Sequence, residues 1–319
     1  MSRRPAAETS PDLAGAGLVV LAAACFGTLG PLSRFAGDAG VDSLAIVTWR
    51  AALGAAVMGG FIAARLLLLR VRPVPLRSLP VRERWFMLAA AAANTVLNLA
   101  AFIAFERITI ALTLLVFYLY PAGVAIVSTA WFGERLDRLR WAALGVSLAG
   151  LVLVVAGDPA GVGSLDALGI GLAFVGALAQ LFYVLAARHG FAHVPGPQAA
   201  ALTMAGALTL YLLISLLTDS LATLARPLAS VEALWPVVVA GVVGAGVPTV
   251  AYITGIRMLG PSRAAILATL EPVIGVVLAA WLLAEQPTPV QVIGGVLILA
   301  AAVLLQLRGG PAAEHEAVG

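Results

Sequence analysis

The strongest candidate for chemistry is a carboxylate inside an apolar segment. Residues Ala264–Ala284 are long enough to cross a hydrocarbon core about 30 Å thick, yet they contain Glu271 followed directly by Pro272. At the helical rise, Glu271 lies roughly 10 Å below the surface where this segment begins. Acidic side chains at such depth usually face a cavity or a partner, and burial disfavours their charged form. Glu271 is therefore expected either to bind and release a proton or to be a neutral structural plug.

Pro272 predicts an interruption of the same helix. It has no N–H, and its ring crowds the carbonyl of Ala268, so the helix should bend and leave that carbonyl without its usual partner. Irregular backbone at membrane depth is tolerated only where it lines protein or water. Pro272 is thus a candidate hinge or gate beside a solvent-accessible site.

Arg50 is the second charge predicted to lie within a span. It sits roughly 10 Å from the outer end of its segment, so its long stem could snorkel outward to the interface. Its two roles are a structural anchor or a ligand contact. We do not expect a direct ion pair with Glu271, because the two residues lie at different depths.

Other polar and aromatic side chains share helical faces with these charges. The pairs Asn94 and Asn98, Gln180 and Tyr183, and Thr249 and Tyr252 are three or four residues apart. Such groups often only bond a neighbouring helix, at about 0.6 kcal/mol each. Aromatic residues also flank the proline positions, where packing is the alternative to ligand contact. The predicted substrate-binding residues are Glu271, Asn94, Asn98, Tyr118, Tyr120, Gln180, Tyr183, Thr249, Tyr252, Trp281 and Arg50.

Catalytic and metal chemistry find little support. His189 and His193 have a metal-like spacing, but Gly190 and Pro195 break the helix that would present them. Phosphate-loop, nucleophile-elbow and zinc-protease motifs do not occur in the sequence. The single cysteine, Cys25, excludes an internal disulfide. We predict no catalytic residues, no metal and no cofactor.

Composition places these residues in a membrane. Of the 319 residues, 61% are hydrophobic and 11% charged, with a mean hydropathy of +1.03, whereas a soluble domain carries about 25% charged residues. The apolar runs predict ten spans: Leu13–Phe35, Ser43–Leu69, Trp85–Phe105, Ile108–Gly133, Trp141–Gly157, Ala167–Ala187, Pro197–Thr218, Leu234–Ile256, Ala264–Ala284 and Pro289–Leu307.

Arginine sets the predicted orientation. The chain has no lysine, and with a cytoplasmic N-terminus 15 of its 19 arginines fall on the inner side and three on the outer side. Both termini are then cytoplasmic. The predicted organisation is a tail at 1–12, a five-helix repeat at 13–157, an external linker at 158–166, a second five-helix repeat at 167–307 and a tail at 308–319.

The two halves resemble each other. An offset of 151 places Tyr120-Pro121 on Glu271-Pro272 and Glu134 on Glu285. Because each half has an odd number of spans, the second copy must be inverted. The predicted fold is therefore an all-α polytopic membrane protein of ten transmembrane helices in two inverted repeats. Matching proline-broken helices, at Pro121 and Pro272, are typical of a midplane binding site between such repeats.

On these features the sequence resembles the EamA-type transporters of the drug/metabolite transporter superfamily. The resemblance rests on the segments Tyr120-Pro121 to Leu136 and Glu271-Pro272 to Glu285, each followed by a short polar loop and a glycine-bearing helix. It covers about Leu13 to Leu307. It implies a ten-helix carrier in the cell membrane, with both termini inside, that moves small organic molecules and often exports them.

We therefore expect a secondary transporter of small organic metabolites, with alternating access and coupling to protons or to solute exchange. The expected partners are a small-molecule substrate, the bilayer and a coupling proton, with no nucleic acid. The alternatives are an integral-membrane enzyme acting on lipid-linked substrates, which would need paired acids or a histidine–acid couple, and a noncatalytic scaffold. The sequence leaves the substrate and the oligomeric state open.

Overall fold

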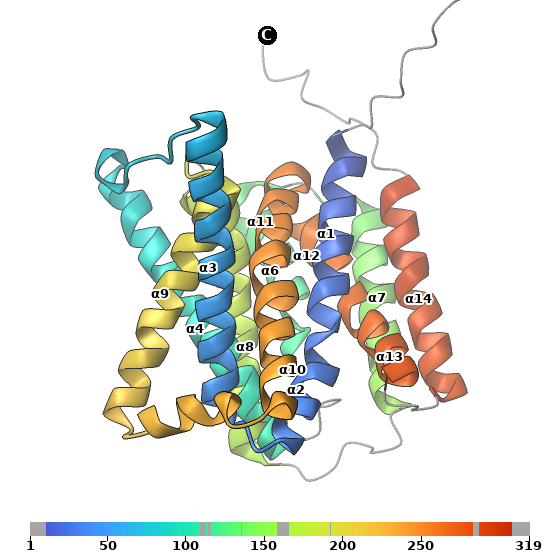
Figure 1. Ribbon diagram of the computed structural model, residues 1–319. Helices are drawn as coiled ribbons and strands as arrows, with labels where there is room; N and C mark the ends of the chain where they lie inside the picture. The colour runs from blue at the N-terminus through green and yellow to red at the C-terminus, as the bar shows by residue number, and fades with distance from the viewer. Residues whose placement is uncertain are drawn as a thin grey trace, which may run out of the picture.

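The computed structural model describes residues 11–108, 113, 116–134, 136–157, 166–191, 193–282 and 287–307, and these residues form helices and loops without a strand. Most helices lie side by side as one bundle, and α1 begins and α14 ends at the same end of it (Figure 1). The first-half helices are α1 (Pro11–Gly27), α2 (Leu29–Asp38), α3 (Ser43–Leu69), η1 (Leu76–Ser78), α4 (Val81–Arg107), α6 (Tyr120–Phe132) and α7 (Arg138–Ala156). The second-half helices are α8 (Ala167–Leu185), η2 (Ala186–Gly190), α9 (Gly196–Leu217), η3 (Leu221–Leu228), α10 (Val231–Gly241), η4 (Val242–Gly246), α11 (Val247–Leu259), α12 (Pro261–Ala268), α13 (Leu270–Leu282) and α14 (Pro289–Leu307).

Seven helical stretches of the described chain are long and apolar enough to cross a membrane. They coincide with the first, second, third, fifth, sixth, seventh and eighth predicted spans. The ninth span is divided between α12 and α13. The fourth span is partly outside the described residues and contains α6, and the tenth coincides with α14. Crossing of the membrane by these three remains a prediction.

Aspartates fix the starts of three long helices. The carboxylates of Asp42, Asp137 and Asp166 accept the backbone N–H groups of Ala45, Arg140 and Leu168 at 2.7–2.8 Å, which satisfies donors that have no intrahelical partner. Asp166 also pairs with Arg107 at 2.7 Å. The Leu168 N–H and then Arg107 hold the pKa of Asp166 below its usual value.

The helix that contains Glu271 is interrupted where Pro272 predicts. Helix α12 ends at Ala268, Thr269 N–H turns back to the carbonyl of Ile266 at 3.1 Å, and α13 restarts at Leu270 with Pro272 in its first turn. In the first half, α6 likewise starts at Tyr120 with Pro121 in its first turn. Both breaks therefore place a proline just after the restart, and Glu271 occupies the position of Tyr120.

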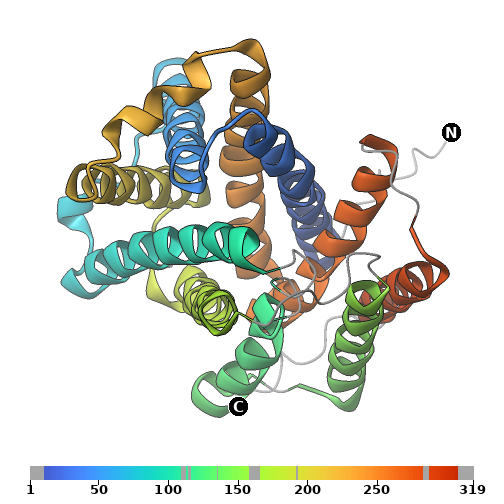
Figure 2. The same cartoon turned by 90° about the horizontal axis from the view of Figure 1, so that it is seen from below.

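The packing pairs of the two halves correspond. Helix α4 packs against α8, and its second-half counterpart α11 packs against α1; α4 also contacts α9, as α10 contacts α3. The equivalent helices α7 and α14 pack directly against each other, as do α3 and α9, and the two pairs lie on opposite sides of the bundle (Figure 2). This exchange of partners is what a two-fold relation between repeats produces.

Helices α7 and α14 cross glycine on glycine. A Cβ built on Gly150 would lie 2.6 Å from the Gly294 carbonyl oxygen, and one on Gly294 would lie 2.5 Å from the Gly150 carbonyl oxygen. Both distances are too short for a side chain, so the helices approach closely because both residues are glycine.

We predict that Gly150→Ala destabilises the protein by about 1–3 kcal/mol, because the added methyl group overpacks this crossing. Gly145→Ala on the same helix is the matched control, since nothing lies within 4 Å of its added Cβ. Thermal unfolding of detergent-purified protein measures both. Equal melting temperatures for the two variants would contradict the close approach.

Candidate functional site

Glu271 lies in a cluster to which both halves of the chain contribute. Tyr118 lies in the turn just before α6, and Tyr120 begins α6. Gln180 comes from α8, Tyr252 from α11, and Glu271 from the first turn of α13. The Tyr120 and Tyr252 hydroxyl oxygens are 3.4 Å apart, and the Gln180 side chain lies within reach of both. The Tyr118 hydroxyl lies next to the Glu271 carboxylate without a well-formed hydrogen bond. The three tyrosines are at most 4% exposed, whereas Glu271 is partly exposed.

Aromatic rings form the wall around these polar groups. Phe117, Tyr118 and Tyr120 have ring centroids 5.6–5.8 Å apart, and the ring of Phe26 on α1 meets Tyr252 edge to face at 6.4 Å. The tyrosines contribute hydroxyl donors near Glu271, and all of these residues contribute aromatic faces. Such a lining suits a small organic ligand with an apolar body and few polar groups.

Arg50 organises an adjoining polar cluster. Its guanidinium donates from Nη1 to Asn98 Oδ1 at 2.6 Å, and from Nη2 and Nε to the Gly244 carbonyl at 3.0 and 3.2 Å. Asn98 in turn donates to the backbone carbonyl of Asn94 at 2.8 Å. Arg50 is only 7% exposed. The possibility that its side chain snorkels outward is therefore wrong, because the π-helical turn η4 provides the Gly244 carbonyl that holds it inside.

Three further predicted site residues make no hydrogen bond to Glu271. Thr249 donates to the backbone carbonyl of Ala245 at 2.5 Å. Tyr183 is buried on α8, with Arg257 and Tyr252 in its electrostatic surroundings. Trp281 is 80% exposed. The prediction that Trp281 lines the binding cavity is therefore wrong. Helix α13 turns this ring to the outside of the bundle, where an aromatic side chain can contact lipid.

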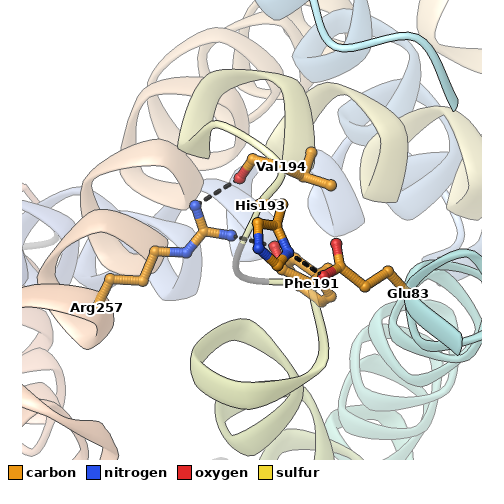
Figure 3. A network of polar contacts seen from close by, with 5 residues as sticks. All are labelled: Glu83, Phe191, His193, Val194 and Arg257. Atoms are coloured by element: carbon orange, nitrogen blue, oxygen red, sulfur yellow. Dashed lines mark hydrogen bonds and ion pairs between the residues drawn. The ribbon is translucent and has the colours of Figure 1, made fainter. Parts of the chain in front are cut away.

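A second polar network, which the sequence did not reveal, ties elements together near the end of the bundle where α1 begins. Arg257 on α11 donates to the carbonyls of Val194, Phe191 and Ala187 at 2.6, 2.9 and 3.2 Å, and His193 contacts the buried Glu83 of α4 (Figure 3). The turn at 186–195 contains a π-helix and Pro195, so several carbonyls lack helical partners, and a guanidinium has enough donors to satisfy them. The glycine and proline of this turn were the sequence features that indicated unpaired carbonyls, but only the fold shows that Arg257 donates to them.

Two further contacts close the same end. Arg263 on α12 pairs with Asp12 on α1 at 3.2 Å, and Ser262 donates to Glu134, after α6, at 3.0 Å. Glu285, the predicted counterpart of Glu134, lies outside the described residues. Together with Arg257 these contacts join α1, α4, α6, α11 and α12.

Comparison with known proteins now identifies the family. Two segments of the chain, residues 13–156 and 167–307, each match the EamA-like transporter family. The chain belongs to the EamA-like transporter family. This result confirms the resemblance drawn from the proline segments, and the two matched segments correspond to the two predicted repeats.

A solved structure also shares this fold. One crystal structure, titled only as that of a protein, aligns with a TM-score of 0.77 at 23% identity over 92% of this chain and 96% of its own. A search of curated proteins finds no match. The family places the chain among membrane transporters of small molecules, and the solved structure shows that the fold is shared.

We predict that Arg257→Gln lowers the melting temperature clearly, because the lost hydrogen bonds involve a charged group and each is worth about 1.5–3 kcal/mol. Arg257→Lys should give an intermediate loss, since an ammonium group is a point charge without the guanidinium fork. Arg226→Gln, at an exposed position of η3, is the control. Wild-type stability of Arg257→Gln would contradict a clamping role.

Proposed function

We propose that the protein is a secondary transporter that moves small organic metabolites across the cytoplasmic membrane by alternating access. The observation that carries this proposal is the position of Glu271: an acid beside a broken helix, surrounded by side chains from both repeats. A site shared by two halves changes its accessibility when the halves rearrange. Export is the direction that the family resemblance suggests.

The proposed architecture is ten transmembrane helices in two inverted five-helix repeats, with both termini cytoplasmic. Support comes from the exchange of packing partners between the halves and from the distribution of arginine, most of which falls on one side. On this topology, the contacts of Arg257, Arg263 and Glu134 lie at the cytoplasmic end. They hold that end closed, and opening it requires their release.

The proposed binding cavity is lined by Glu271, Gln180 and the tyrosines Tyr118, Tyr120 and Tyr252, with Arg50, Asn94 and Asn98 at its edge. Pro121 and Pro272 act as hinges, because each lies where its helix already lacks a continuous hydrogen-bond ladder. Movement of α6 and α13 about these breaks would expose the cavity to one side at a time.

Glu271 is proposed to couple transport to protons. A carboxylate in a low-dielectric environment takes up a proton more readily than one in water, because its charged form is less stable there. When α13 moves, the same group faces the opposite solution and releases the proton there. The sequence carries no phosphate-binding loop, so the energy comes from a proton or solute gradient.

The test begins with a thermal-shift screen of metabolites on detergent-purified protein, because a ligand of the folded state raises its stability with concentration. Hits are then assayed for uptake into proteoliposomes with and without a pH gradient. We expect gradient-dependent uptake in the wild type. Glu271→Gln should lower that uptake about tenfold or more, a loss of about 1.4 kcal/mol or more, and abolish its pH dependence.

Trp281→Ala is the matched control on the same helix, since its side chain points away from the cavity and its replacement should leave uptake unchanged. Unaltered pH-dependent uptake by Glu271→Gln would remove the proton role. Failure of every ligand that binds the wild type to cross the membrane would remove the transport function.

A further inference from the structure

Arg50 is a buried cation without a carboxylate partner. Its direct acceptors are the amide oxygen of Asn98 and the carbonyl of Gly244, both neutral. Among the described residues, no acidic side chain makes an ion pair with it. Glu271 influences it electrostatically but makes no direct contact. A charge buried in this way is costly unless an opposite charge joins it.

The guanidinium also retains unused donors. An arginine carries five N–H groups, and the contacts with Asn98 and Gly244 engage three of them. One N–H on each terminal nitrogen therefore has no protein acceptor among the described residues. Two N–H groups in a fixed planar arrangement match the two oxygens of a carboxylate.

A small cavity borders this guanidinium. Its polar wall consists of Arg50, Asn94, Asn98 and Tyr211, and small side chains such as Ala51 and Ala245 complete it. The wall includes both Arg50 and Asn94, each 7% exposed. The cavity thus combines a buried positive charge and an amide group, and in this structure it has room for about one water-sized group.

We infer that Arg50 and this cavity form a carboxylate subsite, and that the transported solute is a small organic monoanion. The inference rests on the proposed transport function and specifies its substrate class. The carboxylate of the solute would accept the two remaining N–H groups of Arg50. Because the cavity is no larger than a water in this structure, the carboxylate would enter when the two halves rearrange, and the apolar body of the solute would extend toward the aromatic rings of Phe26 and Tyr252.

The charge of the cavity wall argues against other classes. It has one cationic side chain and no second one among the described residues, so it neutralises a single negative charge rather than a phosphate dianion. An organic cation would meet Arg50 as a like charge in a low-dielectric environment, which is unfavourable. A neutral solute would leave the buried charge unpaired.

The experiment compares the carboxylates benzoate, phenylacetate and acetate with benzamide and benzylamine, which resemble benzoate in shape, all at millimolar concentrations. Thermal unfolding of detergent-purified protein is measured for the wild type, Arg50→Lys, Arg50→Gln and Arg226→Gln. We expect benzoate to raise the melting temperature in a saturable manner, while benzamide and benzylamine do not. Arg226→Gln should respond like the wild type, because Arg226 is exposed and lies on η3.

The Arg50 variants separate binding from structure. Arg50→Lys keeps the charge but loses the fork, so the benzoate concentration for half the effect should rise about tenfold. Arg50→Gln should lose the effect; if it does not fold, Arg50→Lys alone decides the outcome. The inference is overturned if benzamide or benzylamine stabilises the wild type as benzoate does, if benzoate, phenylacetate and acetate all fail, or if Arg50→Lys responds as the wild type does.

These outcomes are distinguishable from failure of the transport function. Uptake of a cationic or neutral metabolite into proteoliposomes would leave the carrier in place and remove the carboxylate subsite. Saturable stabilisation by benzoate without movement of any solute would leave the subsite in place and remove transport.

Discussion

Removing a charged side chain from water has to be compensated by groups that the fold itself provides, and this requirement governs the interior of the bundle. Glu271 is accommodated because α12 and α13 are separate helices, so that its first-turn position faces tyrosines from the opposite half. Arg50 is accommodated because the π-helical turn at 242–246 directs the Gly244 carbonyl toward it. In both places the regular α-helical hydrogen bonding of the backbone is interrupted next to a charged side chain. These are also the places where a ligand can find unsatisfied groups.

The same requirement explains the polar contacts that join helices at one end of the bundle. The turn between η2 and α9 leaves carbonyls without helical donors, and Arg257 supplies them from α11. Glu83 and His193 then join α4 to that turn. A closure that depends on a few charge-assisted contacts can be released at moderate cost, whereas the glycine crossing of α7 and α14 is close packing without such contacts. The two kinds of interface fit the proposed mechanism, in which the α7–α14 side stays fixed and the other contacts are released.

Much of this arrangement was predictable from the sequence, because hydropathy and proline have direct local consequences. The apolar runs located the seven long helices, and Pro272 located the break before Glu271. The repeat of Tyr120-Pro121 in Glu271-Pro272 indicated the family. Side-chain direction was less predictable. Trp281 and Glu271 lie on the same helix, and only the rotation of α13 sends one outward and the other inward. Arg50 could snorkel or turn inward, and the deciding carbonyl of Gly244 lies almost two hundred residues away in sequence. The clamping role of Arg257 was not predicted, because its acceptors are backbone carbonyls, and these cannot be identified from residue types. In the sequence it served only as evidence for topology.

The central claim is that the cavity between the two repeats opens to either side in turn. Gln180→Cys in a Cys25→Ala background tests it most directly, with a membrane-impermeant thiol reagent applied to one face at a time. Because Gln180 lies beside Tyr120 and Tyr252, alternating access predicts that position 180 is labelled from both faces in a cycling population, and that Arg257→Gln increases labelling from the cytoplasmic face. Labelling from one face only, unchanged by Arg257→Gln and by added ligand, would contradict it.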